Sequence, residues 1–341
     1  MTNKKTGVLL VNLGSPKSPS NGDVFTYLNE FLTDERVIDI PWLPRQLLVR
    51  GIIVPTRYKN SARTYREIWT KDGSPLIVYS QILTEKIKAK LGEDFLVELA
   101  MRYQEPSINQ ALERLQQSGV EKIIIFPLYP QYASASTGSI MQKVMEIVSK
   151  WQAIPELAFI SNYYDNPAYI EALYQIGKTY NWQEYDFVLF SYHGLPERQL
   201  RKADITKNHC LTHPDCCKQK CDANRLCYRM QCWATTEVLA ERLGIPTELR
   251  TFCFQSRLGK EPWLQPFTWE VLENLAKEGK KKVLVFSPSF VADCLETIYE
   301  IKEEYLELFQ KHGGEQLQLV ESLNTNEYWI NAVESMIREK M

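Results

Sequence analysis

Short apolar runs alternate with helical spacing along this chain, and the alternation occurs twice. The first round has apolar runs at Val8–Leu13, Phe95–Arg102 and Lys122–Phe126, and the second has runs at Phe187–Tyr192 and Lys282–Phe286. Such a pattern indicates β-α-β units with parallel strands. We therefore expect an α/β fold of two Rossmann-like, doubly wound lobes with parallel sheets and a cleft between the lobes.

The length of 341 residues suits two domains of this kind. We expect residues 1–152 to form the N-terminal lobe and residues 153–312 the C-terminal lobe, which carries a cysteine-rich insert at 202–232. Residues 313–341 are expected to supply a strand and a helix that pack back on the N-terminal lobe.

Charge and motif content exclude several functions. The net charge of −2 gives no reason to expect nucleic acid as a partner. No glycine-rich phosphate loop follows a predicted strand, which argues against a nucleotide cofactor. Apolar runs of 18 residues are lacking, and the apolar run near the N-terminus is too short for a signal peptide. We therefore expect a cytoplasmic protein.

The stretch Trp42–Val54 is apolar but contains two arginines, one proline and a glycine. One interpretation is a core helix. The other is an exposed apolar lip beside a pocket or against a membrane surface, because exposed apolar patches usually mark an interaction.

A histidine ends one of the buried strands. Phe187–Tyr192 leads directly into His193, and Gly194 and Pro196 stop the strand soon afterwards. In open α/β sheets ligands bind at the carboxyl ends of the strands. His193 is therefore either a core histidine or, as its position favours, part of a ligand site.

Acidic residues follow another buried strand. Asp293 and Glu296 come after Lys282–Phe286, and Glu300 and Glu304 continue from Glu296 at intervals of four on one helix face. Such rows are usually solvated acidic faces. The functional alternative is that these carboxylates and His193 bind a divalent first-row metal or accept protons.

Six of the eight cysteines fall between Cys210 and Cys232, together with His209 and His213. In a cytoplasmic protein this clustering indicates a metal site rather than disulfides. The spacing does not separate zinc from an iron–sulfur cluster, and it contains no CxxC pair.

Seven segments together resemble the ferrochelatase family, whose members insert ferrous iron into a porphyrin at the end of heme synthesis. In chain order they are VLLVNLGSP, GSPL, MRY, LYPQY, SYHGLPER, FQSRLGKEPWLQP and ADCLETIYEI. The resemblance implies a two-lobed enzyme with the porphyrin in the cleft, Fe(2+) as substrate, release of two protons and no nucleotide. Protoporphyrin IX is the expected porphyrin, and coproporphyrin III is the alternative.

The resemblance also implies roles for individual positions. His193 matches the family histidine that takes pyrrole protons or binds iron, Glu296 matches the opposing glutamate, and Asp293 and Glu300 match its supporting acids. The resemblance places the following positions near the porphyrin or its propionates: Leu13, Arg57, Tyr65, Ser74, Arg102, Tyr103 and Trp263. It favours the lip interpretation of Trp42–Val54, and hence peripheral contact with the inner membrane. A monomer and a homodimer are both compatible with it.

Some family members carry a [2Fe–2S] cluster with ligands near the middle and in a C-terminal extension. Here the middle position is Ser134 and no such extension precedes Met341, so the insert resembles that of a subgroup with an internal cluster. This favours [2Fe–2S] over zinc. The expected ligands are Cys210, Cys216, Cys217 and Cys227, with Cys221 or Cys232 as replacements for one of the adjacent pair. A heme or metal sensor without catalysis is a further alternative, although the complete set of His193, Asp293 and Glu296 argues against it.

Overall fold

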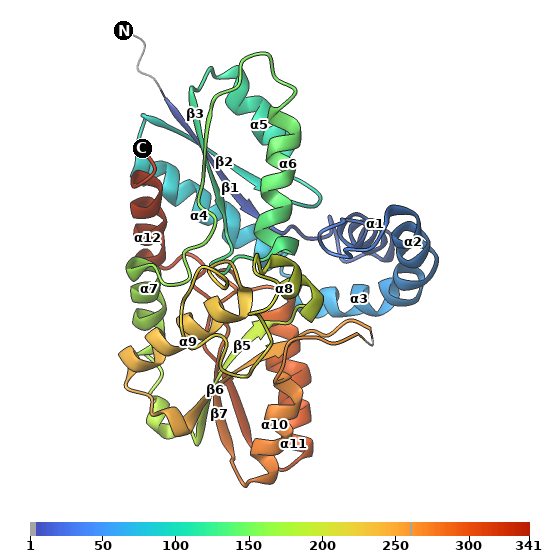
Figure 1. Ribbon diagram of the computed structural model, residues 1–341, viewed down its shortest axis with the longest axis vertical. Coiled ribbons are helices and arrows are strands. Elements are labelled where there is room, and N and C mark those ends of the chain that lie inside the picture. The colour runs from blue at the N-terminus through green and yellow to red at the C-terminus, as the bar shows by residue number, and fades with distance from the viewer. Residues whose placement is uncertain (1–4, 260) are drawn as a thin grey trace. The chain divides into compact units, whose positions relative to one another are not determined.

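The computed structural model describes residues 5–259 and 261–341. The chain divides into two compact units. The first consists of residues up to 129 together with 133–162 and 330–341, and the second consists of 130–132 and 163–329. Each unit contains one four-stranded parallel sheet with helices, which confirms the predicted α/β class (Figure 1).

The first sheet has the strand order β2-β1-β3-β4, and every neighbouring pair is parallel. Its strands are β1 (Thr6–Asn12), β2 (Phe95–Met101), β3 (Lys122–Pro127) and β4 (Glu156–Phe159). The helices of this unit are α1 (Asn21–Leu32), α2 (Trp42–Leu48), α3 (Val54–Ile68), α4 (Pro75–Leu91), α5 (Ile108–Gln117) and α6 (Ser139–Val148), with π-helical segments at Val49–Ile53 and Ser134–Gly138. All seven residues of β1 are buried, as expected for an apolar inner strand.

The second sheet repeats this arrangement, with the order β6-β5-β7-β8 and parallel pairs throughout. Its strands are β5 (Phe187–His193), β6 (Arg250–Gln255), β7 (Lys282–Phe286) and β8 (Gln316–Leu319). The α-helices are α7 (Pro167–Gly177), α8 (Glu197–Ala203), α9 (Tyr228–Leu243), α10 (Thr268–Lys277) and α11 (Leu306–Lys311). A π-helix at Glu296–Tyr305 leads directly into α11, and short 3-10 turns lie at Trp182–Glu184 and Thr247–Leu249. The last helix is α12 (Glu327–Arg338).

In each sheet the first strand in the chain, β1 or β5, is followed by a strand on one side of it and then by a strand on its other side. The strand order therefore reverses between β1 and β3 in the first unit and between β5 and β7 in the second. Ligands of open α/β sheets bind outside the carboxyl ends of the strands at such a reversal. In the second unit this position lies between the end of His193's strand and the segment that leads to Asp293.

Two expectations differ from the structure. The helix expected to carry Glu296, Glu300 and Glu304 is a π-helix that continues into the short α-helix α11. The strand and the helix expected in 313–341 do not both pack on the N-terminal lobe. The strand β8 pairs with β7 in the second sheet, whereas residues 330–341 belong to the first unit.

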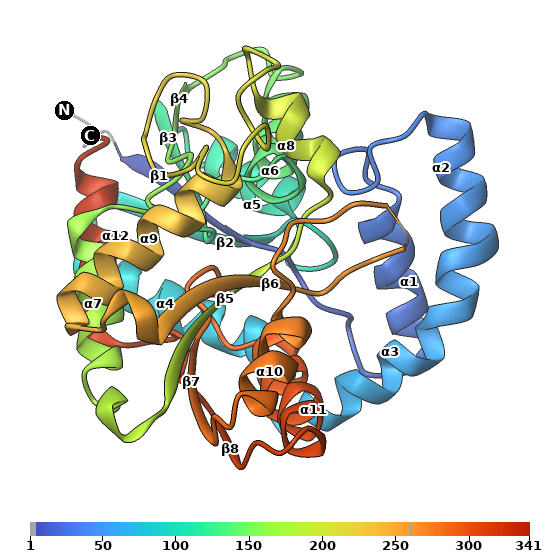
Figure 2. The same ribbon diagram turned by 60° about the horizontal axis from the view of Figure 1, so that its bottom comes forward.

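The stretch Trp42–Val54 is a helical segment with an exposed apolar side. Trp42, Leu43, Leu47 and Ile52 are 58–66% exposed, whereas Val49 and Val54 pack with Leu32 and Ile38 beneath them. Figure 2 shows α1, α2 and α3 together, away from β1 and β2 of the same unit. The core-helix interpretation is therefore wrong for the outer face. Among the described residues, no helix has the length and apolarity needed to cross a membrane.

Candidate active site

His193 is the last residue of β5 and is half-buried. In the parallel sheet it lies opposite Gln255, the last residue of β6. Its Nδ1 is 2.7 Å from the carbonyl oxygen of Gly194. A carbonyl oxygen only accepts hydrogen bonds, so Nδ1 carries a proton and Nε2 is the ring nitrogen that remains for other contacts. The local geometry thus prepares Nε2 to accept a proton or bind a metal ion.

Gly194 is required by a close approach of the backbone. Its N–H donates to the carbonyl oxygen of Gln255 at 2.7 Å. A Cβ at this position would lie 2.8 Å from that oxygen and 3.2 Å from Cε3 of Trp263. Trp263 is 7% exposed and forms a β-bridge with Pro196. The predicted substrate residue Trp263 therefore packs directly beside the histidine loop.

The acidic residues follow β7 and are fixed by their neighbours. Asp293 is 9% exposed, and its carboxylate accepts hydrogen bonds from Asn324 Nδ2 at 2.8 Å and Thr297 Oγ1 at 3.2 Å. Asn324 also accepts the Asp293 N–H at 2.8 Å. Asp293 thus holds the chain just before the π-helix that begins at Glu296.

Glu300 lies one π-helical turn beyond Glu296. Burial, the nearby charge of Glu296 and, to a smaller extent, Glu304 raise the pKa of Glu300 to about 8, against the hydrogen bonds from Ser256 and Gln255. Burial and Glu307 also raise the pKa of Glu304. The interpretation of this row as a solvated acidic face is therefore wrong for Glu300, whose carboxyl group is held inside the second unit.

In the first unit, two predicted substrate residues contact an aspartate. Asp34 accepts hydrogen bonds from Arg102 Nη2 at 2.5 Å and from the Tyr103 hydroxyl at 2.9 Å, and Ser139 donates to the same oxygen. Arg102 Nε also donates to Ser139 at 2.6 Å. The side chains of Arg102 and Asp34 are 17% and 5% exposed. The charge of Arg102 is thus already balanced within the unit.

The other predicted substrate residues of this unit have different surroundings. Leu13 follows β1, and its carbonyl oxygen accepts the Tyr103 N–H at 2.9 Å. Ser74 is buried at the N-terminus of α4. Tyr65 is buried and makes edge contacts with Tyr27 and Trp69, whereas Arg57 is exposed on α3.

The cysteine insert gathers four buried thiols. Cys210, Cys216, Cys217 and Cys227 are each 3–4% exposed, and the sulfur atoms of Cys216 and Cys217 are 3.8 Å apart. A hydrogen bond with Cys227 is the first cause of the raised pKa of Cys217, and one with Cys210 is the first cause of the raised pKa of Cys227. Cys221 is exposed and Cys232 is fully buried.

Hydrogen bonds therefore link the four thiols in the order Cys216, Cys217, Cys227 and Cys210. Within the described part of the chain, no group of three or more His, Cys, Asp or Glu side chains is arranged to hold a metal ion. The donor set nevertheless has the right chemistry, because four thiolates are what a [2Fe–2S] cluster or a structural zinc requires. The loop is anchored by Asp204, which accepts the N–H groups of His209 and Cys210 at 2.8 Å.

Three residues outside the predicted site shape these contacts. Gln255 and Ser256 contact the π-helix, and the sequence signal for them is a short polar run at the end of a predicted strand. Tyr228 donates from its hydroxyl to the His193 carbonyl oxygen at 2.9 Å, and it follows Cys227 immediately. Nothing in the sequence pattern marked Tyr228.

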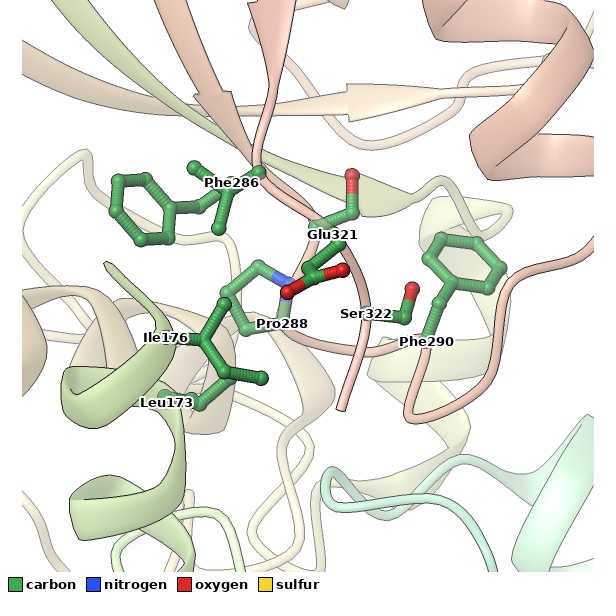
Figure 3. Close-up of a pocket in the computed structure, with 9 residues that line it drawn as sticks. Leu173, Ile176, Phe286, Pro288, Phe290, Glu321 and Ser322 are labelled. Atoms are coloured by element: carbon green, nitrogen blue, oxygen red, sulfur yellow. The ribbon is translucent and has the colours of Figure 1, made fainter. Parts of the chain in front are cut away.

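One small cavity lies in the second unit, between α7 and the segments that follow β7 and β8 (Figure 3). It is lined mainly by apolar side chains, including Leu173, Ile176, Phe286 and Phe290. Its volume of about 10 Å³ admits a single water molecule at most. None of the predicted site residues lines it, so it is not the site of the chemistry.

Comparison with known proteins decides the family. A sequence model described as ferrochelatase matches residues 5–341. The chain belongs to the ferrochelatase family. Curated ferrochelatases from Opitutus terrae and Pseudomonas fluorescens (strain SBW25) are 45% and 43% identical over 97% and 96% of this chain and 96% of their own lengths. A ferrochelatase from Legionella pneumophila (strain Lens) is 43% identical over 98% of this chain and 99% of its own.

Ferrochelatases are metal chelatases that insert iron into a porphyrin in heme biosynthesis, and this confirms the predicted class of enzyme. The fold comparison agrees: SirB from Bacillus subtilis with Fe3+ has a TM-score of 0.56 at 13% identity and covers 98% of this chain and 95% of its own. At this identity the likeness concerns the fold alone.

Proposed function

We propose that this ferrochelatase inserts ferrous iron into protoporphyrin IX and that the reaction takes place at the carboxyl end of the second sheet. The observation that carries the proposal is the hydrogen bond from His193 Nδ1 to the Gly194 carbonyl oxygen, which leaves Nε2 as the ring nitrogen that can take a proton or a metal ion. Insertion must remove two pyrrole protons, so the site needs a base of this kind.

In this proposal His193 accepts a pyrrole proton, and Glu296 is the opposing group that meets the ferrous substrate as it loses water. Glu300 accepts protons within the second unit, which suits a carboxyl group whose pKa burial raises to about 8. Asp293 holds the start of the π-helix through Asn324 and Thr297. The remaining residues bind the porphyrin or its propionates: Leu13, Arg57, Tyr65, Ser74, Arg102, Tyr103 and Trp263.

The test is an anaerobic assay of iron insertion with His193→Ala and Glu296→Gln. Each variant is expected to lose at least about a hundredfold in kcat, which is typical for removal of a positioned base. Gln318→Leu on β8 is the matched control, because among the described residues its side-chain amide donates only to the neighbouring Leu319 carbonyl oxygen. Normal turnover by His193→Ala would overturn the assignment of the base.

The same assay with protoporphyrin IX and coproporphyrin III side by side identifies the porphyrin. Faster turnover of coproporphyrin III would replace protoporphyrin IX as the substrate. Tight porphyrin binding with no insertion of iron into either porphyrin would favour the sensor function instead.

For the cysteine insert we propose a [2Fe–2S] cluster held by Cys210, Cys216, Cys217 and Cys227. The support is that these four thiols are buried together and are joined in series. Such a cluster would supply one-electron chemistry when bound. Anaerobically purified protein is expected to be brown and to contain two irons per chain, and Cys216→Ser is expected to remove both the colour and the iron. A colourless protein with one zinc per chain would refute the cluster.

For the exposed side of Trp42–Val54 we propose peripheral contact with a membrane. Four large apolar side chains are exposed there, and Arg50 and Arg57 are exposed close by in the chain. Apolar and cationic groups together favour anionic lipid surfaces. The protein is expected to sediment with vesicles of anionic phospholipid, and Trp42→Ser with Leu47→Ser is expected to abolish this. Ile154→Ser, which removes an exposed apolar side chain elsewhere, is the control.

A further inference from the structure

The side-chain amide of Gln255 connects three segments of the second unit. Gln255 is 2% exposed. Its Oε1 accepts the Ser191 hydroxyl at 2.8 Å, and its Nε2 donates to the Glu296 carbonyl oxygen at 2.9 Å and to Glu300 Oε2 at 2.8 Å. Because the carbonyl oxygen of Glu296 only accepts, the amide nitrogen must face the π-helix. Gln255 thus joins the inner strand β5 to the helix that carries the acids.

The contact on β5 is made close to the histidine. Ser191 is fully buried and also bonds to the Thr268 hydroxyl at 3.0 Å. Side chains two residues apart in a strand point to the same face, so Ser191 and His193 share one face of β5. His193 is also the register partner of Gln255. The Gln255 amide therefore has a fixed orientation beside the strand end that holds His193.

Ser256 adds a second donor to the same carboxyl group. Its hydroxyl donates to Glu300 Oε2, the oxygen that Gln255 also contacts. Ser256 has a φ of 64°, in the left-handed region that non-glycine residues seldom adopt. Such a backbone persists where the surroundings fix it, and it is common at functional sites. Two successive residues at the end of β6 thus converge on one oxygen atom.

We propose that Gln255 and Ser256 are positioning residues for iron insertion, which hold the Glu300 carboxyl group at the end of β6 and set the pH range in which it accepts a proton. This inference rests on the proposed role of Glu300 as a proton acceptor. Both residues donate hydrogen bonds to the charged carboxylate, and they therefore oppose the effects of burial and of Glu296 on the pKa of Glu300.

The hydrogen bonds that lower the pKa of Glu300 come from the end of β6. The charged neighbours, Glu296 and Glu304, lie on the π-helix itself, as does Tyr305, whose own pKa is raised by burial and then by Glu300. The contribution of β6 is uncharged and consists of the Gln255 amide and the Ser256 hydroxyl. Removal of either donor leaves the repulsion between Glu300 and the carboxylates of Glu296 and Glu304 in place. It also removes one of the two hydrogen bonds that lower the pKa of Glu300.

The experiment measures kcat for ferrous iron and protoporphyrin IX against pH in Gln255→Leu and Ser256→Gly. Leucine keeps much of the glutamine volume, and glycine keeps the left-handed backbone. Loss of one donor to a charged group is expected to move the acidic limb of kcat upward by about one pH unit, which lowers kcat about tenfold below that limb. At high pH kcat is expected to recover, and KM for the porphyrin stays within about twofold, because neither change removes a porphyrin contact.

Gln318→Leu is the control and is expected to leave the profile unchanged. A uniform loss of kcat at every pH, or an unshifted profile, would overturn the inference and indicate a purely structural role. If Gln255→Leu fails to fold by circular dichroism, Ser256→Gly decides alone.

Glu300→Gln separates the two proposals. A Glu300→Gln enzyme with the wild-type pH profile of kcat would refute Glu300 as proton acceptor and the inference with it. A Glu300→Gln enzyme that loses activity, beside donor variants with unshifted profiles, would refute the inference alone.

Discussion

Gly194→Ala is the sharpest test of the histidine loop. The added Cβ would lie 2.8 Å from the Gln255 carbonyl oxygen, about 0.6 Å inside an ordinary contact of 3.4 Å. The obstructing atom belongs to the backbone of β6, so a side-chain rotation cannot relieve the contact. Overpacking of this kind costs about 1–3 kcal/mol in the free energy of unfolding.

The larger effect is expected on catalysis, because Gly194 adjoins His193 and also accepts its Nδ1 hydrogen bond. Active groups must be held within about 0.5 Å, and a displacement of about 1 Å costs roughly a hundredfold in rate. We therefore expect kcat for iron insertion to fall between about tenfold and a hundredfold, with a lower midpoint of thermal unfolding.

Gly22→Ala is the matched control, because a Cβ there meets no atom within 4 Å. Its position in α1 makes alanine neutral or stabilising. Wild-type kcat in a folded Gly194→Ala enzyme would refute the reasoning, and so would an equal loss in Gly22→Ala.

Three further changes test other contacts. Tyr228→Phe removes the hydrogen bond to the His193 carbonyl oxygen and is expected to lower the free energy of unfolding by about 1 kcal/mol, measured by thermal unfolding, and to lower kcat several-fold. An unchanged kcat would show that this contact does not position His193. Burial and Glu296 raise the pKa of Glu300 in the folded protein to about 8, above its ordinary value of 4.5, so its contribution to stability is present at low pH and is lost as pH rises through 8. Glu300→Gln is therefore expected to raise the unfolding midpoint at pH 9 relative to wild type but not at pH 4, and equal shifts at both pH values would contradict this. Gly14→Ala would place a Cβ 1.9 Å from the Tyr103 carbonyl oxygen at a residue whose φ is +108°. Because alanine fits neither the space nor the backbone conformation, little folded protein is expected on size-exclusion chromatography, and a normal yield would contradict the close approach of these two backbone segments.

The parts of the fold that depend on local pattern were predictable from sequence. The apolar runs at Phe187–Tyr192 and Lys282–Phe286 became adjacent strands β5 and β7, because buried parallel strands are nearly continuous in apolar residues. The end of β5 then put His193 at the edge where the strand order reverses. The π-helix was not predictable, since four-residue spacing of glutamates is compatible with both kinds of helix.

The polar contacts that adjust the candidate site could not be predicted, because they join residues far apart in the chain. Gln255 and Glu300 are 45 residues apart, and Arg102 and Asp34 are 68 apart. Long side chains reach many neighbours, and only the packed fold selects among them. The exposure of Trp42 and Leu47 was left open for a similar reason, since an apolar helix has the same pattern whether its outer face is covered or not.

The pairing of Arg102 with Asp34 has a consequence for how a carboxylate is recognised. A guanidinium that already has a counter-ion offers an incoming anion an exchange of partners, and the free energy gained is only the difference between the two pairs. Exposed Arg57 has no such internal competitor among the ion pairs described for the chain. In the proposed site, long-range attraction of a propionate and its decrease with added salt are therefore expected to depend on Arg57, and discrimination by fit is expected to depend on Arg102.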